Sequence, residues 1–365
     1  MEKQKEESLK QRDIFDWRFI TSPVVLAEIS KICQKNVCWK TNVLQFIKNR
    51  TRRCLEISEA LRSGKYEKSK PRHVIINERG KKRVISPVIF KDRIVQRSLC
   101  EFCLLPLIVP TLIYDNTASI KGKGTGFSRS RFLKHYKGAL DAFGNSGYFV
   151  KIDYHDYFHS IDNQKCWEKF ETLVWKRAKQ ISFNGRSWCE IEKDVIKILN
   201  LMKQFVFEEK GLGLGNQTSQ ILAIWYCNEI DHFIKEKLQI RRYGRYMDDS
   251  YAFVQNKAEG HKILDYVKYA SHELGLVINE RKSRLYKIDE PIVWLKDVYT
   301  LNDKGEINIS IKSSVVRRFV KHYKSIYKKY GYEDAKESLI SFLSCKNRVS
   351  NPGKFEKVVL GKIES

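Results

Sequence analysis

The sequence predicts an α+β fold, and two observations indicate it. Segments with a helical spacing of apolar residues are mixed with short runs of β-branched and aromatic residues along the chain. Several of these runs come in pairs around turn-forming residues, as the strands of antiparallel hairpins do. A doubly wound α/β fold would instead alternate single strands with helices. The sequence therefore predicts antiparallel sheets packed with helices.

The N-terminal part is predicted to be helical and then to form a hairpin. Residues 1–65 have a mostly helical pattern, which includes a basic segment at 48–53. Two β-branched runs, 73–76 and 83–85, flank a turn-like segment at 77–80 that ends in glycine. These two runs predict the first antiparallel hairpin.

A buried helix is predicted after this hairpin. We expect a helix to begin at Lys91, and an apolar stretch follows from Leu99 to Tyr114, interrupted by one glutamate and two prolines. This stretch is too short to span a bilayer, so it is predicted to be a core helix that ends near the prolines. Cys100 and Cys103 lie within it and are predicted to be buried thiols rather than a zinc or redox site.

The rest of the chain continues the mixed pattern of helices and hairpins. The expected elements are a strand at 148–152 leading into Asp153, helical segments at 163–205, a long helix from the glycine-rich turn 211–215 to about residue 238, a hairpin at 241–254, a helix at 259–274, a strand near Val277, a hairpin at 292–309 and a basic helical region after Ser313. Asp248 and Asp249 lie at the tip of the second of these hairpins.

Composition indicates a globular protein with a polyanionic partner. Of the 365 residues, 42% are hydrophobic and 30% are charged, which is a globular rather than a disordered composition. Lys and Arg number 68 against 43 Asp and Glu, a formal net charge of +25. Such an excess favours binding to nucleic-acid phosphates, which release counterions when basic side chains replace them. The alternative is a basic protein kept soluble by its charge.

Two features predict a cytoplasmic protein without a membrane partner. The N-terminus is polar and lacks an apolar signal-peptide stretch. The nine cysteines are odd in number and scattered, which suits a reducing compartment.

Two places in the sequence combine a predicted strand with aspartates. Asp153 follows the strand at 148–152, and Asp248 and Asp249 lie between two strands. Adjacent carboxylates repel each other unless a cation lies between them, and hard oxygen ligands suit Mg²⁺. Two such ions about 4 Å apart can bind the attacking and leaving oxygens of a phosphoryl transfer. The alternative is a polar turn at the paired aspartates and a helix cap at Asp153.

With these residues the sequence resembles the reverse transcriptase family, and six motifs occur in family order over roughly residues 70–310. They are the fingers segment Lys81-Lys82-Arg83, Asp153 to Phe158, the glycine box Gly213 to Gln220, the Tyr246-Met247-Asp248-Asp249 box, Leu274-Gly275-Leu276 with Lys282, and Trp294-Leu295-Lys296 at the place of the primer grip. The resemblance implies a right-hand polymerase. Its expected parts are N-terminal helices and fingers at 1–147, a palm at 148–298 with a helical finger insertion at about 163–205, and a thumb with basic C-terminal helices at 299–365.

The resemblance also implies roles for individual residues. Asp153, Asp248 and Asp249 would be the catalytic metal ligands for two Mg²⁺ ions, with Mn²⁺ as a substitute. The nucleotide-binding set would be Lys81, Lys82, Arg83, Tyr154, Asp156, Phe158, Leu214, Gly215 and Lys282. Within this set, Phe158 falls at the steric gate that favours deoxynucleotides, and Lys282 would be the general acid for pyrophosphate. The primer-grip and nucleic-acid-binding set would be Trp294, Leu295, Lys296, Arg317, Arg318 and Lys321. The alternatives are ordinary hairpin surface for the fingers segment, core packing for Phe158, and solvated charge for Lys282 and the basic C-terminal helix.

Departures from the retroviral pattern point to a subgroup. Leu214 stands where retroviral enzymes have Gln, and the box ends in Ser219-Gln220 rather than Ser-Pro. These features resemble bacterial and phage reverse transcriptases of diversity-generating retroelements, and the "unknown group" and abortive-infection enzymes of antiviral defence. Leu214 cannot hydrogen-bond a nucleotide as Gln can, which predicts weaker base discrimination. Trp294-Leu295-Lys296-Asp297 stands where the family usually has Phe-Leu-Gly, which changes the expected grip contacts.

The resemblance implies an RNA-directed DNA polymerase that joins deoxynucleotides to a primer 3′-hydroxyl. Its partners would be an RNA template, which could be a dedicated noncoding RNA, and a DNA primer or product. An accessory protein or oligomer is left open. The alternatives are template-independent or protein-primed DNA synthesis, an RNA-directed RNA polymerase, and a catalytically silent RNA-binding scaffold.

Overall fold

The structure is a computed structural model that describes residues 13–70, 73–78, 81–181, 185–207 and 210–364. The chain forms two compact units, each built from discontinuous segments. Unit 1 contains residues up to Ile120, Tyr154–His232 and Lys268–Ile278, and unit 2 contains Lys121–Asp153, Phe233–Val267 and Asn279–Ser365. The helices and antiparallel sheets of both units give the α+β class that the sequence predicted.

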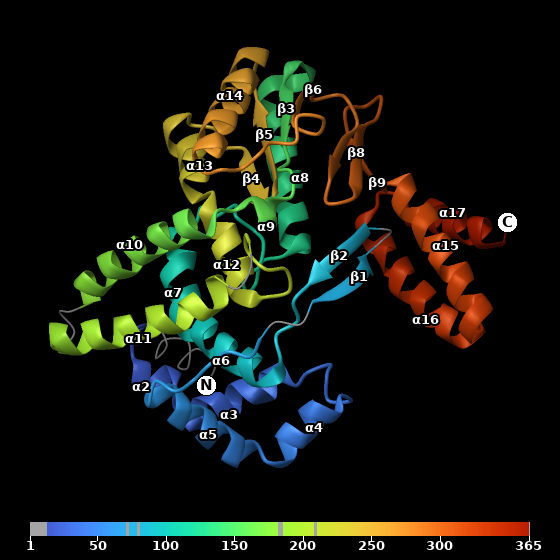
Figure 1. Cartoon of the computed structure of the whole chain (residues 1–365). Coiled ribbons are helices and arrows are strands. Elements are labelled where there is room, and N and C mark those ends of the chain that lie inside the picture. Colours follow the sequence, from blue (N-terminus) through green and yellow to red (C-terminus); the bar gives the residue numbers. More distant parts are fainter. Residues whose placement is uncertain (1–12, 71–72, 79–80, 182–184, 208–209, 365) are drawn as a thin grey trace. The chain divides into compact units, whose positions relative to one another are not determined.

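Unit 1 is mostly helical. Its main helices are α2 (Trp17–Ile20), α3 (Pro23–Cys33), α4 (Thr41–Lys48), α5 (Arg50–Arg62), α6 (Phe90–Leu99), α7 (Leu105–Ile108), α9 (Tyr157–Ser160), α10 (Asn163–Ile181), α11 (Trp188–Val206), α12 (Gln217–Tyr226) and α13 (Asn228–His232). A two-stranded antiparallel hairpin, β1 (Val74–Glu78) and β2 (Lys81–Ile85), lies among them in sequence, as Figure 1 shows. The hairpin confirms the first strand pair predicted from the sequence.

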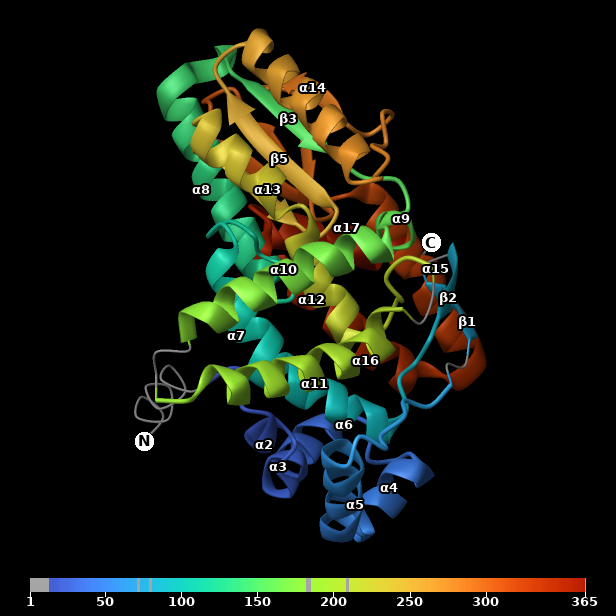
Figure 2. The same ribbon diagram turned by 60° about the vertical axis from the view of Figure 1, so that its left-hand side comes forward.

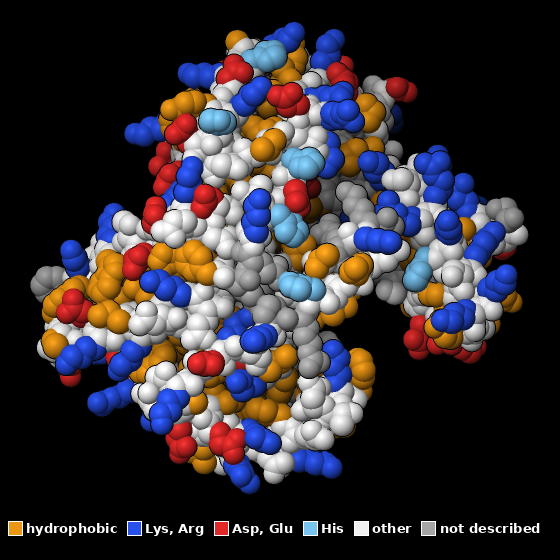
Figure 3. Space-filling view, viewed as in Figure 1, with side chains coloured by type: hydrophobic (Ala, Val, Ile, Leu, Met, Phe, Trp, Pro, Cys, Tyr) orange, Lys and Arg blue, Asp and Glu red, His pale blue; other side chains and the backbone are white. Residues whose placement is uncertain are grey.

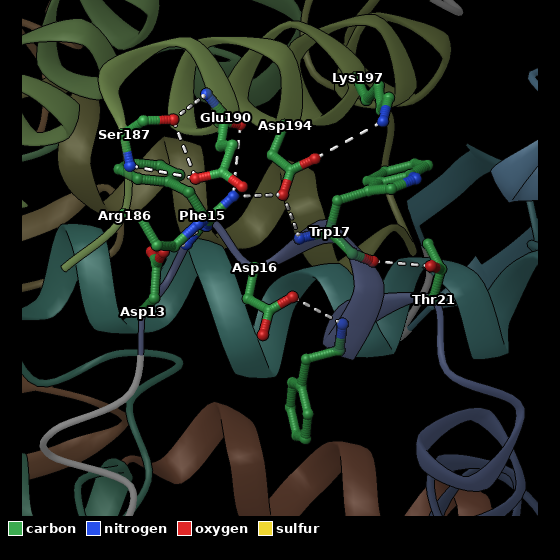
Figure 4. A network of polar contacts seen from close by, with 11 residues as sticks. Asp13, Phe15, Asp16, Trp17, Thr21, Arg186, Ser187, Glu190, Asp194 and Lys197 are labelled. Carbon is green, nitrogen blue, oxygen red and sulfur yellow. Dashed lines mark hydrogen bonds and ion pairs between the residues drawn. The ribbon is translucent and has the colours of Figure 1, made fainter. Parts of the chain in front are cut away.

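The N-terminal segment is fastened to the start of α11 by a network of charges (Figure 4). Arg186 forms an ion pair with Asp13, and its Nη2 lies 2.7 Å from Oδ2 of Asp194 in α11. The same carboxylate oxygen accepts a 3.3 Å hydrogen bond from the backbone N–H of Trp17. Ser187 and Glu190 form a capping box at the first turn of α11, which satisfies two backbone N–H groups that the helix leaves open.

The apolar stretch predicted as a core helix is part of a longer helical run. The segment Phe90–Thr111 passes from α6 through a π-helical turn at Cys100–Leu104 into α7, and by length and composition it is long enough to cross a membrane. The expectation that it is too short therefore fails, because the helix begins well before Leu99. Its burial favours a core helix, since 56% of its most apolar window is inside the protein. Cys100 and Cys103 are fully buried, and burial raises the pKa of both thiols.

Unit 2 is centred on a four-stranded antiparallel sheet. The strand order is β4 (Tyr243–Tyr246), β5 (Asp249–Val254), β3 (Tyr148–Ile152) and β6 (Arg284–Lys287). Helix α8 (Thr125–Phe143) covers one face of this sheet, and the part of α14 (Lys257–Glu273) that belongs to unit 2 covers the other (Figure 2). The central pair β3–β5 is therefore buried on both faces.

A second, three-stranded sheet completes the core of unit 2. It has the order β7 (Ile292–Trp294), β8 (Asp297–Leu301) and β9 (Ile307–Ile311). One aromatic cluster joins both sheets to α8, and its buried members are Phe132, Tyr136, Ala139, Phe149, Tyr251, Phe253, Ile288, Ile292, Trp294 and Tyr299. Rings packed edge-on and stacked in this way hold the two sheets in a fixed relation.

The C-terminal helices form a separate small core within unit 2. Helix α15 (Ser313–Tyr330) is followed by α16 (Tyr332–Leu343) and α17 (Pro352–Glu364). The apolar positions of α15 at Val316, Val320 and Tyr323 recur at helical spacing and are buried. These helices match the predicted basic helical region after Ser313.

Several predicted elements differ in detail. The segment 163–205 is helical as predicted and consists of α10 and α11. The long helix expected to continue to residue 238 is broken after Tyr226 and again at the π-helical turn Phe233–Lys237. The strand expected near Val277 is only a single β-bridge between Tyr154 and Ile278. The strand that completes the sheet is β6, which the sequence analysis did not predict.

Candidate active site

The paired aspartates lie on a two-residue hairpin turn. Tyr246 of β4 pairs with Asp249 of β5, so only Met247 and Asp248 lie between the strands. Met247 has φ of 56°, a left-handed conformation that glycine would adopt more easily. The guanidinium of Arg245, which is 1% exposed, donates a 3.2 Å hydrogen bond from Nη1 to the Met247 carbonyl oxygen. Buried polar support of this kind holds the strained turn in place.

Asp153 lies beside this hairpin because of the strand register. β3 and β5 are antiparallel neighbours, and the last pair in their ladder is Ile152 with Ser250. One residue further on, Asp153 stands opposite Asp249. The residues of one face alternate along a strand, so Lys151 and Asp153 share a face. The sheet thus brings Asp153 to the same edge as Asp248 and Asp249, which follow it by about a hundred residues in the sequence.

The grouped carboxylates change the electrostatics of the site. Burial raises the pKa of the Asp249 carboxyl to about 7; the Lys151 ammonium, whose Nζ lies 3.9 Å from Oδ1 of Asp249, opposes this shift. The Asp248 and Asp153 carboxylates add to the rise. Three carboxylates thus share one edge with the Lys151 and Lys282 ammonium groups, and a bound cation would relieve the repulsion among the carboxylates.

The Lys282 side chain lies in the same site. Its Nζ lies 2.8 Å from Oδ2 of Asp153, and this hydrogen bond is the largest cause of the raised pKa of the Lys282 ammonium. Lys282 is half exposed at its side chain while the Asp153 side chain is only 7% exposed. The protein thus places a protonated amine at the edge of the carboxylate group.

Two residues that the sequence analysis missed hold Asp153 in place. Asn279 donates from its side chain to Oδ2 of Asp153 at 3.1 Å and from its backbone to the Asp153 carbonyl at 2.8 Å. Ser283 accepts from the Asp153 N–H at 3.0 Å and donates to its carbonyl oxygen at 3.1 Å. No local motif marks either residue, although both flank Lys282. Lys151 was also missed, and its two-residue spacing from Asp153 is the signal that could have identified it.

The donor set fits an open site for a divalent cation. Across the described part of the chain, no three His, Cys, Asp or Glu side chains form a closed metal-binding group. The Asp153 carboxylate is paired with Lys282 instead. Mg²⁺ commonly binds through one or two carboxylates and completes its shell with water and substrate phosphates, so oxygen donors at an exposed sheet edge are chemically suited to it.

Apart from Lys282, the residues predicted to bind the nucleotide lie in unit 1. Gly211 has φ of 75°, and a Cβ there would lie 2.6 Å from the Phe158 carbonyl oxygen and 2.5 Å from Cα of His159. The next residue, Leu212, donates its N–H to the same Phe158 carbonyl at 2.8 Å. Only glycine permits this approach, so the glycine-rich turn 211–215 is packed directly on the backbone of the predicted steric gate.

Leu214 and Gly215 continue this connection toward the fingers hairpin. The Ser86 N–H, one residue after β2, is directed at the Leu214 carbonyl oxygen at 3.4 Å. A groove of about 490 Å³ lies beside Gly215. Its polar lining includes the basic side chains Lys40, Arg93 and Arg97 and the amides Gln96, Gln217 and Gln220.

Other members of the predicted nucleotide set differ in exposure. Phe158 is half-buried and Asp156 is exposed, with φ of 46° and its Oδ1 2.9 Å from Nδ1 of His159. The Tyr154 ring is buried and stacks on the Tyr157 ring, so it supports the segment that leads from Asp153 into α9. Lys82 is exposed on β2. The side chains of Lys81 and Arg83 lie outside what the structure describes.

The predicted grip and basic helix are both in unit 2. Trp294 is fully buried, so its side chain supports the hairpin and is not itself a nucleic-acid contact. Leu295 is half-buried and Lys296 is exposed in the turn that follows. Arg317, Arg318 and Lys321 are exposed on α15, opposite its buried positions. Figure 3 shows many Lys and Arg side chains over this helix.

A sheet edge that gathers three carboxylates beside a lysine has the donor chemistry that two-metal phosphoryl transfer uses. Residues 67–325 match the family described as reverse transcriptase (RNA-dependent DNA polymerase), and the chain belongs to this family. Its mixed helices and antiparallel sheets agree with the right-hand polymerase fold of this family.

Solved structures similar to this chain include two telomerases. Telomerase from Candida albicans, in complex with a TWJ fragment of telomeric RNA, is 13% identical with a TM-score of 0.48, covering 80% of this chain and 59% of that one. Apo telomerase from Candida tropicalis is 12% identical with a TM-score of 0.49, covering 81% and 62%. The chain thus spans about three fifths of the length of these proteins. A comparison with curated proteins finds no match.

Proposed function

We propose that this enzyme extends a primer 3′-hydroxyl with deoxynucleotides on an RNA template, by phosphoryl transfer assisted by two Mg²⁺ ions. The observation that carries the proposal is the edge formed by Asp153, Asp248 and Asp249. Their carboxylates would hold the ions, with Mn²⁺ as a substitute. The bound ions would supply activation of the 3′-hydroxyl and neutralisation of charge on the leaving pyrophosphate.

Lys282 supplies a proton in this scheme. Its ammonium is kept protonated by the 2.8 Å contact with Asp153 and by the neighbouring carboxylates. A protonated amine at the edge of the site can pass a proton to the departing pyrophosphate and take it back from water. The same contact orients Lys282 before substrate arrives.

Selection of a deoxynucleotide is assigned to Phe158. The close packing of Gly211 and Leu212 on the Phe158 carbonyl oxygen holds the backbone that carries its ring. An aromatic ring held in place excludes a ribose 2′-hydroxyl by steric contact, whereas a mobile ring would move aside and admit it. Lys81, Lys82 and Arg83 would bind the triphosphate by charge-assisted hydrogen bonds.

Templated synthesis is favoured by the groove beside Gly215. It combines guanidinium groups, which bind phosphates, with amide side chains, which can hydrogen-bond base edges. That chemistry suits a single template strand. A template-independent enzyme does not need a groove that binds a template strand. We therefore rank template-independent synthesis second.

For the biological setting we propose a bacterial phage-defence system or a retroelement, in the cytoplasm. Support comes from Leu214 and from Ser219-Gln220, the residues that resemble those subgroups. The net charge of +25 supports a stably bound RNA partner, such as a dedicated noncoding RNA.

The test is to purify the wild type, an Asp248→Ala, Asp249→Ala variant and an Asp303→Ala control with their bound RNA. Asp303 is an exposed aspartate in the turn between β8 and β9. Each protein receives Mg²⁺ and labelled deoxynucleotides, and the product is sequenced. We expect DNA from the wild type and the control alone, with a sequence complementary to the bound RNA. Product without a template match, or DNA covalently attached to protein, would favour the second mode, and no product from any added template would favour a scaffold.

A further inference from the structure

The hairpin at the place of the primer grip has an unusual turn. Trp294 pairs with Asp297, so Leu295 and Lys296 alone connect β7 to β8. Their φ angles are 46° and 76°, so both residues are left-handed. A hairpin turn with positive φ at both positions strongly prefers Asn-Gly, because a branched or long side chain strains this conformation. Neither Leu295 nor Lys296 favours a positive φ angle, so other contacts must hold the turn.

A buried ion cluster provides these contacts. Asp297 is 1% exposed, and its Oδ2 lies 2.7 Å from Nε of Arg129 in α8. Nη2 of Arg129 also donates a 3.1 Å hydrogen bond to the Leu295 carbonyl oxygen. Oδ1 of Asp297 lies 3.2 Å from Nε of Arg348. One carboxylate therefore organises two guanidinium groups, one of which directly binds the strained turn.

The cluster and the turn contact the C-terminal helical region at two points. Arg348 of the cluster lies in the 3₁₀ segment Ser344–Arg348 between α16 and α17. At the start of the region, the N–H of Lys312, which precedes α15, donates to the Lys296 carbonyl oxygen of the turn at 3.0 Å. The turn is thus the point where the basic helices are fastened to the sheet that precedes them.

The same hairpin is connected to the catalytic sheet. Nε1 of Trp294 lies 3.2 Å from the Ser128 oxygen, one residue before Arg129 in α8. The Trp294 ring stacks on Phe132 with centroids 5.7 Å apart and meets Tyr251 edge-on at 4.7 Å. Tyr251 lies in β5, two residues after Asp249. Packed rings therefore run from the base of the turn to the strand that carries a catalytic carboxylate.

We propose that Asp297 is a positioning residue for the primer: through Arg129 and Arg348 it holds Leu295 and Lys296 in their left-handed turn, so that the exposed Lys296 ammonium is held where a primer phosphate lies. This inference rests on the proposed function in one respect, namely that a primer strand occupies the turn. Arg129 and Arg348 are positioning residues with it.

The energetics favour positioning over simple stabilisation. Burial raises the pKa of the Asp297 carboxyl even though Arg129 and Arg348 lower it. The desolvation of the carboxylate thus outweighs its attraction to its partners, as is common for buried ion pairs. A well-packed apolar residue would stabilise the fold at least as well. What the ion cluster adds is a directional hold on a turn that its own sequence disfavours.

The experiment measures binding of a primed RNA template with a fluorescent DNA primer, so it needs no catalysis. The Asp248→Ala, Asp249→Ala background is used, with Asp297→Asn added, with Asp297→Asn plus Leu295→Asn added, and with Asp303→Asn added as a control. Asn at the first turn position restores the intrinsic preference for this turn while keeping Lys296. Melting curves check that each protein is folded.

We expect Asp297→Asn to weaken duplex binding about tenfold, since the loss of one contact from a charged group has an effect of at least about this size. Leu295→Asn should restore most of the loss, and Asp303→Asn should change nothing. Unchanged binding in Asp297→Asn overturns the proposal. So does a loss that Leu295→Asn leaves unrepaired, because that indicates a general structural role.

A second pair of measurements keeps the result interpretable. If Asp297→Asn melts well below the other proteins, Arg348→Gln is used with the same rescue and the same criteria, since it removes one partner and leaves Arg129 in place. Separately, primer extension is measured in the catalytically intact protein. Wild type that extends no primer but binds the duplex in an Asp297-dependent way would refute the proposed activity and leave the positioning role standing.

Discussion

Nζ of Lys282 lies 2.8 Å from Oδ2 of Asp153, so the amine predicted to donate a proton is paired with a carboxylate predicted to bind metal. The two roles compete for the same oxygen. A cation at Asp153 must displace the ammonium or share the carboxylate with it, and either event moves positive charge toward an incoming phosphate. The pair therefore links metal binding to placement of the proton donor.

Lys282→Ala should separate these two effects. We expect kcat for nucleotide addition to fall about 100-fold, as for loss of a general acid. The Mg²⁺ concentration needed for half-maximal rate should also fall, because Asp153 loses its competing cation. Single-turnover rates across a Mg²⁺ titration give both quantities. Lys282→Arg, which keeps the charge but is a poor acid, should keep the Mg²⁺ requirement and lose rate. Equal rates in all three proteins would contradict the proton-donor role.

The pKa of Asp249, raised by burial to about 7, predicts a pH-dependent stability of the metal-free protein. An unfolded aspartate titrates near pH 4, so between about pH 4 and 7 the folded state holds a proton that the unfolded chain releases. The free energy of unfolding should therefore rise as the pH falls through about 7 and level off below about 4 for this group alone.

Mg²⁺ should change this dependence because it competes with the proton. We expect Mg²⁺ to raise Tm more at pH 8 than at pH 6, measured by thermal melts with and without the ion. Asp249→Asn is the matched control, since it keeps the shape and removes the titration. The same Mg²⁺ effect at both pH values in the wild type would show that Asp249 does not govern the site.

Gly211→Ala should destabilise the protein and loosen sugar selection. The new Cβ would lie 2.5 Å from Cα of His159 at a φ of 75°, and we expect a loss of roughly 2–4 kcal/mol in the free energy of unfolding. Because the same contact fixes Phe158, the preference for deoxynucleotides over ribonucleotides should fall. Gly126→Ala is the control: its Cβ meets nothing within 4 Å, so stability should change by less than about 1 kcal/mol. Urea unfolding and competition between the two nucleotides measure both effects.

The exposed face of α15 should contribute phosphate contacts. Replacing Arg317, Arg318 and Lys321 with Ala should reduce the slope of log Kd against log salt by about 2–3 for a primed template. A control with the same change in net charge replaces Lys176, Arg177 and Lys193, exposed on α10 and α11. Anisotropy titrations at several salt concentrations give the slopes. Equal slopes for the two triple variants would mean that only net charge matters.

The placement of the three aspartates at strand ends could be predicted from sequence because its signals are local. A β-branched run leads into Asp153, and two strands flank Asp248 and Asp249. The residue pattern of the strands and the position of the aspartates at their ends were therefore sufficient for this prediction. The hairpins at β1–β2 and β4–β5 followed from the same signals. The helix break after Tyr226 could not be predicted, since no proline or glycine marks it.

Other parts depend on contacts between distant segments. The strand β6, Arg284–Lys287, is polar because it lies at the sheet edge, so it lacks the apolar alternation that marks a strand. The supports of Asp153 from Asn279 and Ser283, and the contact between Asp297 and Arg129, join residues more than a hundred positions apart. A single sequence has no signal for such pairs, and Trp294 was accordingly assigned to the primer although it lies in the core.

Leu214→Gln should lower the error rate of synthesis. Leu214 follows a tight glycine turn and its carbonyl oxygen faces the Ser86 N–H, so its position is fixed by backbone contacts that a Gln side chain would leave intact. Gln adds a donor and an acceptor at the nucleotide site, and we expect roughly three- to tenfold fewer misincorporations. Leu214→Met keeps the apolar character and similar volume and should leave the error rate unchanged. Sequencing of products from one defined template gives the rates, and an unchanged rate in the Gln variant would refute a role for this side chain in base discrimination.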